Sequence, residues 1–250
     1  MNTLLLLLLD SRAPAGAHHH SGGMEAAVGT GLVSGVSDLE DFCRARLRTS
    51  ARVAAAFAVA AGRLQSDWAE RATVPASSPP RAVPAESWAQ ENWAQENWAL
   101  LDAEFEARTP SEATRAASRQ LGGGLLRLLR SVLPDADLVT PWAQCAGPAP
   151  HHPLVLGAGV SLAGGPPELA ARAAALSACA GPASAAVRLL GLDPFAVQAM
   201  LARLAPAIDE CAALAARCAD APSLLPADSA PALDLLADYH LTAEVRLFAS

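Results

Sequence analysis

Apolar residues recur every three to four positions over long stretches of the chain, and this spacing predicts amphipathic helices. The longest stripe lies within residues 193–218, and Pro206 inside it predicts a kink or a break. A run of leucines, Leu4 to Leu9, ends at Asp10 and predicts a buried first helix. We expect roughly eight to ten helices and find no convincing strand.

Local signals place some helix ends. Ser37 and Glu40 have the spacing of a capping box, which predicts a helix from there to about Leu64. Gly181 is expected to end a helix, because glycine adopts the left-handed conformation found there. Residues 122–124 are all Gly and should weaken a helix over residues 111–133, at a place where two backbones approach closely.

Composition supports the helical interpretation. Hydrophobic residues make up 52% of the 250-residue chain but aromatic residues only 4%, so Ala and Leu supply most of the apolar mass. Both are strong helix formers, whereas residues that favour strands are scarce. The sequence therefore predicts an all-α protein, a single-domain helical bundle over residues 1–250 with Pro-rich loops.

Residues 73–97 have the features of a loop insertion. Thr73 to Ala85 holds four prolines, which exclude a continuous helix. The five residues that begin at Trp88 are repeated from Trp93 and begun again at Trp98. A five-residue period matches neither helix nor strand, so we interpret the repeat as a slipped duplication rather than as an aromatic binding stripe.

Charge and cysteine content narrow the function classes. The net charge of −7 and the absence of a basic patch argue against nucleic-acid binding. No apolar run reaches the length that spans a bilayer, so we expect no membrane segment and a cytoplasmic location. The five cysteines are an odd number without a pairing framework, which favours reduced thiols; Cys179 and Cys211 are expected to be buried and inert.

Few residues of the sequence suggest catalysis, nucleotide binding or metal binding. The chain has no Lys, so it has no P-loop lysine for nucleotide binding. Three consecutive histidines, His18, His19 and His20, are the candidate metal ligands, although adjacent side chains rarely converge on one ion. A second group, Cys145 with His151 and His152, lacks a ligand spacing. A stand-alone metal-binding protein or metalloenzyme that uses these histidines remains the alternative interpretation, and Ser21 is expected to cap the helix that follows it.

Several blocks of sequence, in order, resemble the urease accessory protein UreF family. The blocks are Asp10 to Gly16, His20 to Glu25, Leu101 to Gly122, His151 to Pro153, Gly181 to Leu192 and Arg246 to Ser250. They cover most of the chain apart from residues 73–97. The block His20-Ser21-Gly22-Gly23-Met24-Glu25 is the most specific, and we call residues 20–25 the signature segment.

The resemblance implies an all-helical, non-enzymatic scaffold. Family members bind a UreD/UreH-type accessory protein and recruit the GTPase UreG, and the complex loads nickel into apo-urease. The resemblance also implies a homodimer, with no stably bound cofactor and with GTP bound by the partner. The residues that it assigns to partner binding are those of the C-terminal tail, within 241–250, and of the N-terminal segment: Arg246, Leu247, Phe248 and Ser250, with Pro14, Gly16, His20, Ser21, Gly23 and Glu25.

Overall fold

The computed structural model describes residues 3–10, 20–73, 93–134 and 149–241, which form 10 α-helices and no strand. The predicted all-α class is confirmed. The helices are α1 (Thr3–Leu9), α2 (Met24–Gly29), α3 (Val36–Arg48), α4 (Ser50–Thr73), α5 (Trp93–Ala107), α6 (Glu112–Val132), α8 (His152–Leu162), α9 (Pro167–Leu190), α10 (Pro194–Cys218) and α11 (Pro231–Leu241), with a 3₁₀ turn at Pro222–Leu224.

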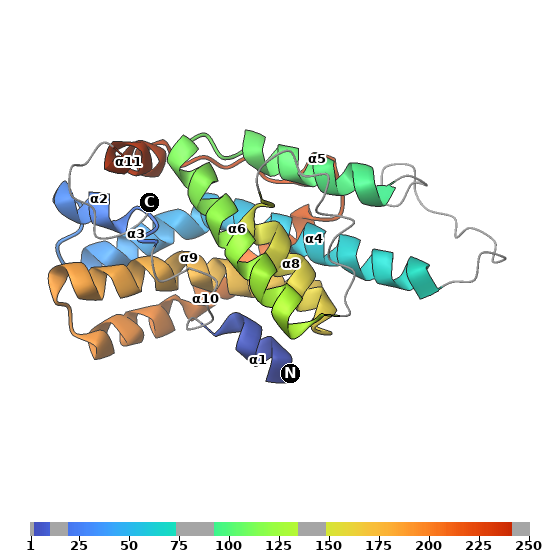
Figure 1. Ribbon diagram of the computed structural model, residues 1–250. Coiled ribbons are helices and arrows are strands. Elements are labelled where there is room, and N and C mark those ends of the chain that lie inside the picture. The colour runs from blue at the N-terminus through green and yellow to red at the C-terminus, as the bar shows by residue number, and fades with distance from the viewer. Residues whose placement is uncertain (1–2, 11–19, 74–92, 135–148, 242–250) are drawn as a thin grey trace.

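Helix α4 is at the centre of the bundle (Figure 1). It packs against α8, α9, α10, α5 and α3, while α6 packs across α8. Helix α11 lies beside α2 and α6, so the last described helix meets the first part of the chain. Two hydrophobic clusters fill the interior: one surrounds α4 and α8, and the other lies between α2, α3, α9 and α10.

Helix α9 passes through this interior. Within the described residues it is long and apolar enough to cross a membrane by length and composition, with a mean hydropathy of 1.4 over its most apolar window. In this fold it packs against α2, α3, α4, α8 and α10, and Ala170, Ala175 and Cys179 are fully buried. Of that apolar window 39% is buried inside the bundle, so one side of α9 packs on its neighbours while residues such as Leu176 are exposed.

Small residues allow two close approaches between segments. A Cβ atom at Gly122 in α6 would lie 2.0 Å from the carbonyl oxygen of Pro150, so the predicted backbone approach is confirmed there. The glycine run does not interrupt α6, which continues to Val132. Gly157 in α8 meets Ala58 of α4 in the same way, since a Cβ atom would lie 2.0 Å from the Ala58 carbonyl oxygen.

Three predicted boundaries were wrong. The helix expected from Ser37 to Leu64 is two helices that join at Thr49, whose backbone angles (φ −130°, ψ −109°) are not helical. Gly35, not Ser37, caps α3, and the hydroxyl and N–H of Ser34 donate to the Asp38 carboxylate. Gly181 lies inside α9 because tertiary packing continues the helix past it to Leu190.

Two further expectations were corrected by tertiary contacts. Helix α5 begins at Trp93, inside the predicted loop insertion, and Trp98 is fully buried because it faces α4 on the same side as Leu101 and Phe105. Helix α10 continues through Pro206, since packing against α3, α4 and α9 holds it on both sides of the proline.

Candidate functional site

The signature segment forms a tight turn that leads into α2. Ser21 accepts a 3.2 Å hydrogen bond at its carbonyl oxygen from the N–H of Met24, and its side chain is fully buried. Gly22 (φ +60°) and Gly23 (φ +86°) occupy the left-handed region, which other residues rarely adopt. Gly23 caps α2 without a side-chain hydrogen bond, so the predicted capping role of the Ser21 hydroxyl was wrong.

Arg46 of α3 joins the signature segment to the bundle. Its Nη1 donates to the Gly22 carbonyl oxygen at 2.9 Å, and its Nε donates to the Ala178 carbonyl oxygen of α9 at 2.9 Å. The guanidinium also lies 5.9 Å from the centre of the Phe42 ring. One side chain therefore holds three parts of the chain that are far apart in sequence.

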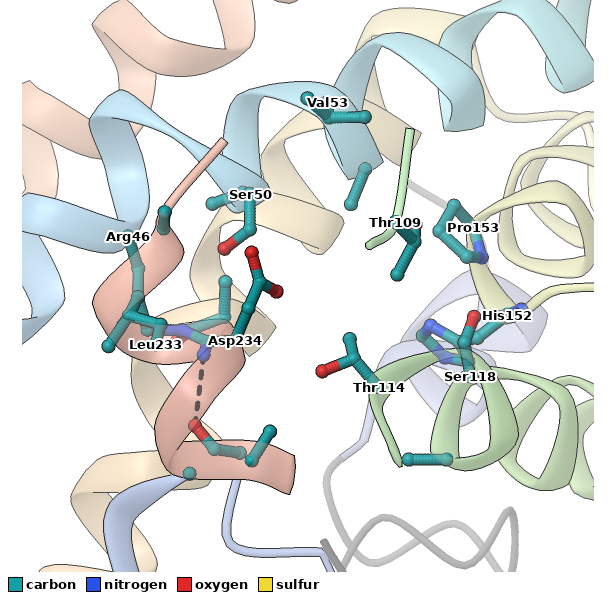
Figure 2. A pocket seen from close by; sticks show the side chains of 18 of the residues that line it. Arg46, Ser50, Val53, Thr109, Thr114, Ser118, His152, Pro153, Leu233 and Asp234 are labelled. Carbon is teal, nitrogen blue, oxygen red and sulfur yellow. Dashed lines mark hydrogen bonds between the residues drawn. The ribbon is translucent and has the colours of Figure 1, made fainter. Parts of the chain in front are cut away.

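A cavity of about 290 Å³ opens beside Arg46. Two segments far apart in sequence contribute to its wall, the signature segment on one side and α11 on another. Figure 2 shows Arg46, Ser50 and Asp234 on one side of this space and Thr114, Ser118 and His152 on the opposite side. The remaining wall is mostly apolar, with Val53, Pro153 and Leu233 among its residues.

Two ionisable groups of the cavity have pKa values that are shifted toward their neutral forms. Burial raises the pKa of Asp234, Asp238 adds to the shift, and Arg46 partly offsets it. Burial also lowers the pKa of His152 to about 4, with a further contribution from His20. The lining also carries the charged residues Arg46, Arg108 and Asp228. A mostly apolar cleft with a few charged residues is suited to binding a segment of another protein chain.

Because the His152 imidazole is neutral in the folded protein, we expect the free energy of unfolding to fall at acid pH. The pKa of His152 is about 4 in the folded protein and 6.5 in the unfolded chain. Between pH 4 and pH 6.5 the unfolded chain therefore binds more protons than the folded protein. Stability therefore increases with pH through this window and is lost as the pH falls. The full contribution is about 3 kcal/mol, an upper limit because His152 keeps partial solvent contact.

This prediction is measured by urea unfolding at pH 7.5 and pH 5. On going from pH 7.5 to pH 5, the free energy of unfolding of the parent chain should fall by about 2 kcal/mol more than that of the His152→Gln variant. Equal losses in the two proteins would contradict a buried, neutral His152.

A second polar group lies outside the cavity and joins α5, α6 and the start of α8. Arg119 Nη2 lies 3.1 Å from Asp102 Oδ2 and 2.6 Å from Glu106 Oε2. His151 Nε2 lies 2.8 Å from the same Glu106 oxygen, and its backbone N–H donates to Asp102 at 3.3 Å. We call Asp102, Glu106, Arg119 and His151 the buried network.

The contacts of the buried network shift the pKa values of Glu106 and His151. Burial opposes ionisation of Glu106, but hydrogen bonds from Arg119 and His151 outweigh it and lower the pKa of Glu106. Burial, together with the Arg119 charge, lowers the pKa of His151 despite its two acidic neighbours. His151 is therefore tied to a carboxylate in a structural role; Cys145, with which the sequence analysis grouped it, lies outside the described residues.

The structure describes only part of the predicted partner-binding set. His20 and Glu25 are half-buried, Ser21 is buried, and Gly23 begins α2. Among the described residues no group of three or more His, Cys, Asp or Glu side chains is placed to hold a metal ion. The other predicted residues lie outside the described ranges: Pro14, Gly16, His18, His19, Cys145, Arg246, Leu247, Phe248 and Ser250.

The sequence matches known proteins over nearly its full length. The UreF family model matches residues 33–205. The urease accessory protein UreF of Mycobacterium sp. strain JLS is 41% identical over 251 residues, covering 99% of this chain and 98% of that protein. The UreF protein of Mycolicibacterium vanbaalenii is 38% identical, covering 98% of this chain and 97% of that protein.

The chain belongs to the UreF family. A third UreF protein, from Mycobacterium marinum, is 38% identical and covers 99% of this chain and 98% of that protein. UreF membership gives the chain a general role as an accessory protein in urease maturation, which is consistent with a protein that is not itself an enzyme.

Sequence reasoning missed two residues of this UreF chain's cavity. Arg46 and Asp234 carry no motif, and each is far in sequence from the signature segment. Arg46 resembles the three other arginines of residues 44–52 by type and spacing, so only its contacts with Gly22 and Ala178 distinguish it. No local signal in the sequence identifies either residue.

Proposed function

We propose that this protein is a scaffold for nickel insertion into apo-urease. In this proposal it binds a UreD/UreH-type accessory protein and recruits the GTPase UreG, which binds the GTP. The chain holds no cofactor stably, and nickel is handled by the assembled complex in the cytoplasm, without nucleic acid or membrane. The acidic composition and the absence of Lys support this division of labour, since this chain cannot supply a P-loop lysine.

The main support is that the signature segment lies near α11, the described helix that directly precedes the tail in sequence. Helix α2, which follows the signature segment, packs against α11, which leads into the tail (Figure 1). The signature segment and α11 line the same cavity, through Gly22 and Gly23 on one side and Leu233, Asp234 and Ala237 on the other. A partner that contacts α11 would therefore also reach the signature segment.

Helix α11 presents apolar side chains to solvent next to this cavity. Leu235 is 71% exposed and Tyr239, one turn later, is 62% exposed. The buried side of the same helix contacts α2 and α6. Large apolar side chains that are adjacent on an exposed helix face often mark a protein–protein contact.

Size-exclusion chromatography with the cognate UreD-type protein tests the proposal. The parent chain should co-elute with the partner, whereas deletion of residues 246–250 should abolish binding and leave the helical circular dichroism spectrum unchanged. The Leu235→Glu variant should bind at least about tenfold more weakly, because it places a charge in the apolar contact. Leu7→Glu is the matched control, since Leu7 is 59% exposed on α1, a helix that packs against α8.

Three results would count against this proposal. If the parent chain and the partner never co-elute, the scaffold role is wrong. Full binding by the deletion variant would restrict the tail to packing on its own chain. Equal weakening by the Leu235 and Leu7 variants would remove α11 from the contact.

We also propose that the protein is a homodimer. Phe195, at the start of α10, is 86% exposed, and Leu32, after α2, is 61% exposed. Burying such side chains against a second copy removes apolar area from water. Light scattering should give about twice the chain mass of 25.6 kDa, and Phe195→Asp should shift the protein toward monomer. A monomeric parent chain at micromolar concentration would contradict this proposal.

A further inference from the structure

Two buried cysteines, Cys43 of α3 and Cys179 of α9, face each other although they are 136 positions apart in sequence. The Cys43 thiol lies 3.9 Å from the carbonyl oxygen of Cys179, and the Cys179 thiol lies 4.0 Å from the carbonyl oxygen of Cys43. Both residues are fully buried. This reciprocal contact places the two cysteines next to each other where α3 packs on α9.

The two thiols also interact directly. A hydrogen bond from Cys43 lowers the pKa of Cys179, and Arg46 acts in the same direction, while burial opposes the shift. The hydrogen bond to Cys179, together with burial, raises the pKa of Cys43. The pKa of Cys179 is therefore lowered while that of Cys43 is raised, so Cys179 is the more readily ionised sulfur of the pair.

A third cysteine nearby differs from this pair. Cys211 of α10 belongs to the same hydrophobic cluster and is 4% exposed. Burial is the main cause that raises its pKa to about 11. Cys211 is therefore an internal comparison with similar burial and a protonated thiol.

We propose that Cys43 and Cys179 are a reversible redox modification site, in which hydrogen peroxide converts the two thiols into a disulfide that cross-links α3 to α9. The Cys179 thiolate attacks one peroxide oxygen, the O–O bond breaks, and the departing hydroxide takes the thiol's proton to form water. Cys43, after losing its proton, attacks the resulting sulfenic sulfur. The S–O bond breaks, and the second hydroxide leaves as water with that proton. One peroxide is reduced to two waters while two thiols are oxidised to one disulfide.

The cross-link would lie beside Arg46, the residue that hydrogen-bonds the signature segment to the bundle. Arg46 follows Cys43 by one helical turn, and its acceptor Ala178 directly precedes Cys179. A covalent bond here would hold α3 and α9 together beside the hydrogen bond from Arg46 to Gly22. The inference rests on this geometry and stands whether or not the scaffold proposal is correct.

Mass spectrometry of the full-length chain tests the site. Cys145 and Cys218 are first changed to Ala, so that three cysteines remain. After peroxide treatment, catalase quenching and alkylation under denaturing conditions, the protein should lose two hydrogen atoms in mass and retain one alkylated thiol. Tryptic peptides containing Cys43 and Cys179 should be linked, and Tm should rise by about 5 °C or more until dithiothreitol reverses it.

Single substitutions distinguish a specific Cys43–Cys179 disulfide from non-specific oxidation of cysteines. Cys43→Ala and Cys179→Ala should each abolish the link and the Tm increase, whereas Cys211→Ala should retain both. A link that involves Cys211 would overturn the proposal. So would oxidation of Cys179 to sulfinic acid without a link, or three alkylated thiols after peroxide treatment.

Discussion

Replacing Arg119 with Ala is expected to lower the free energy of unfolding by about 3–5 kcal/mol, because the substitution leaves a buried charge uncompensated. Asp102 is fully buried, and Arg119 lies 3.1 Å from its carboxylate. Arg119 also donates to the Ala149 carbonyl oxygen at 2.7 Å, so the segment that enters α8 loses a contact as well. Urea unfolding at pH 7.5 measures this loss.

Arg172→Ala is the matched control for the buried network. The pair that Arg172 forms with Asp209 has similar length, 3.1 Å, but both side chains are 62% exposed. Its removal should cost less than about 1 kcal/mol. Adding Asp102→Asn to the Arg119 variant should restore part of the stability, since an amide needs no counter-charge. If the Arg119 and Arg172 variants lost the same free energy of unfolding, burial of the network would not contribute to stability.

Replacing Gly157 with Ala is expected to destabilise the protein by about 3 kcal/mol or more, because the added methyl group meets backbone atoms. Its Cβ would lie 2.0 Å from the Ala58 carbonyl oxygen and 2.9 Å from the Gly62 nitrogen. Neither atom belongs to a side chain that can rotate away, so α4 and α8 would have to separate. Thermal unfolding monitored by circular dichroism reports the change.

Gly181→Ala is the comparison for this substitution. Gly181 is also inside a helix, α9, but a Cβ atom there meets nothing within 4 Å. The added methyl group should leave stability unchanged or raise it by up to about 1 kcal/mol, because Ala has the higher helix propensity. Similar losses at both positions would mean that the helix crossing of α4 and α8 is not tight.

The sequence predicted which segments form helices more accurately than it predicted where those helices end or what they contact. The stripe of residues 193–218 corresponds to α10, and the close backbone approach at Gly122 was anticipated. The single helix from Ser37 to Leu64 was wrong because the break at Thr49 carries no proline or glycine, the residues that mark a break in sequence. The start of α5 at Trp93 was missed because the repeat obscured the spacing of Trp98, Leu101 and Phe105.

The candidate site was predicted in part. The signature segment was identified from its motif, and its two glycines have the positive φ values that explain the motif physically. Arg46 and Asp234 were not identified, since each acts through residues from other helices. The tail residues of the predicted set lie outside the described ranges, so their assignment remains a prediction.

The all-α class, most of the helices and the family could be predicted from the sequence, because helix propensity, apolar periodicity and ordered motifs are local properties of a chain. The positions of the cysteines depend instead on how the helices pack. The sequence predicted reduced thiols with Cys179 and Cys211 buried, and the described cysteines are free, with both of these buried. The packing of α3 on α9 adds what the sequence did not show, because it places Cys43 against Cys179 across 136 positions. The meeting of α2 with α11 arises in the same way. Such contacts depend on how helices pack against one another, which no local pattern in the sequence specifies.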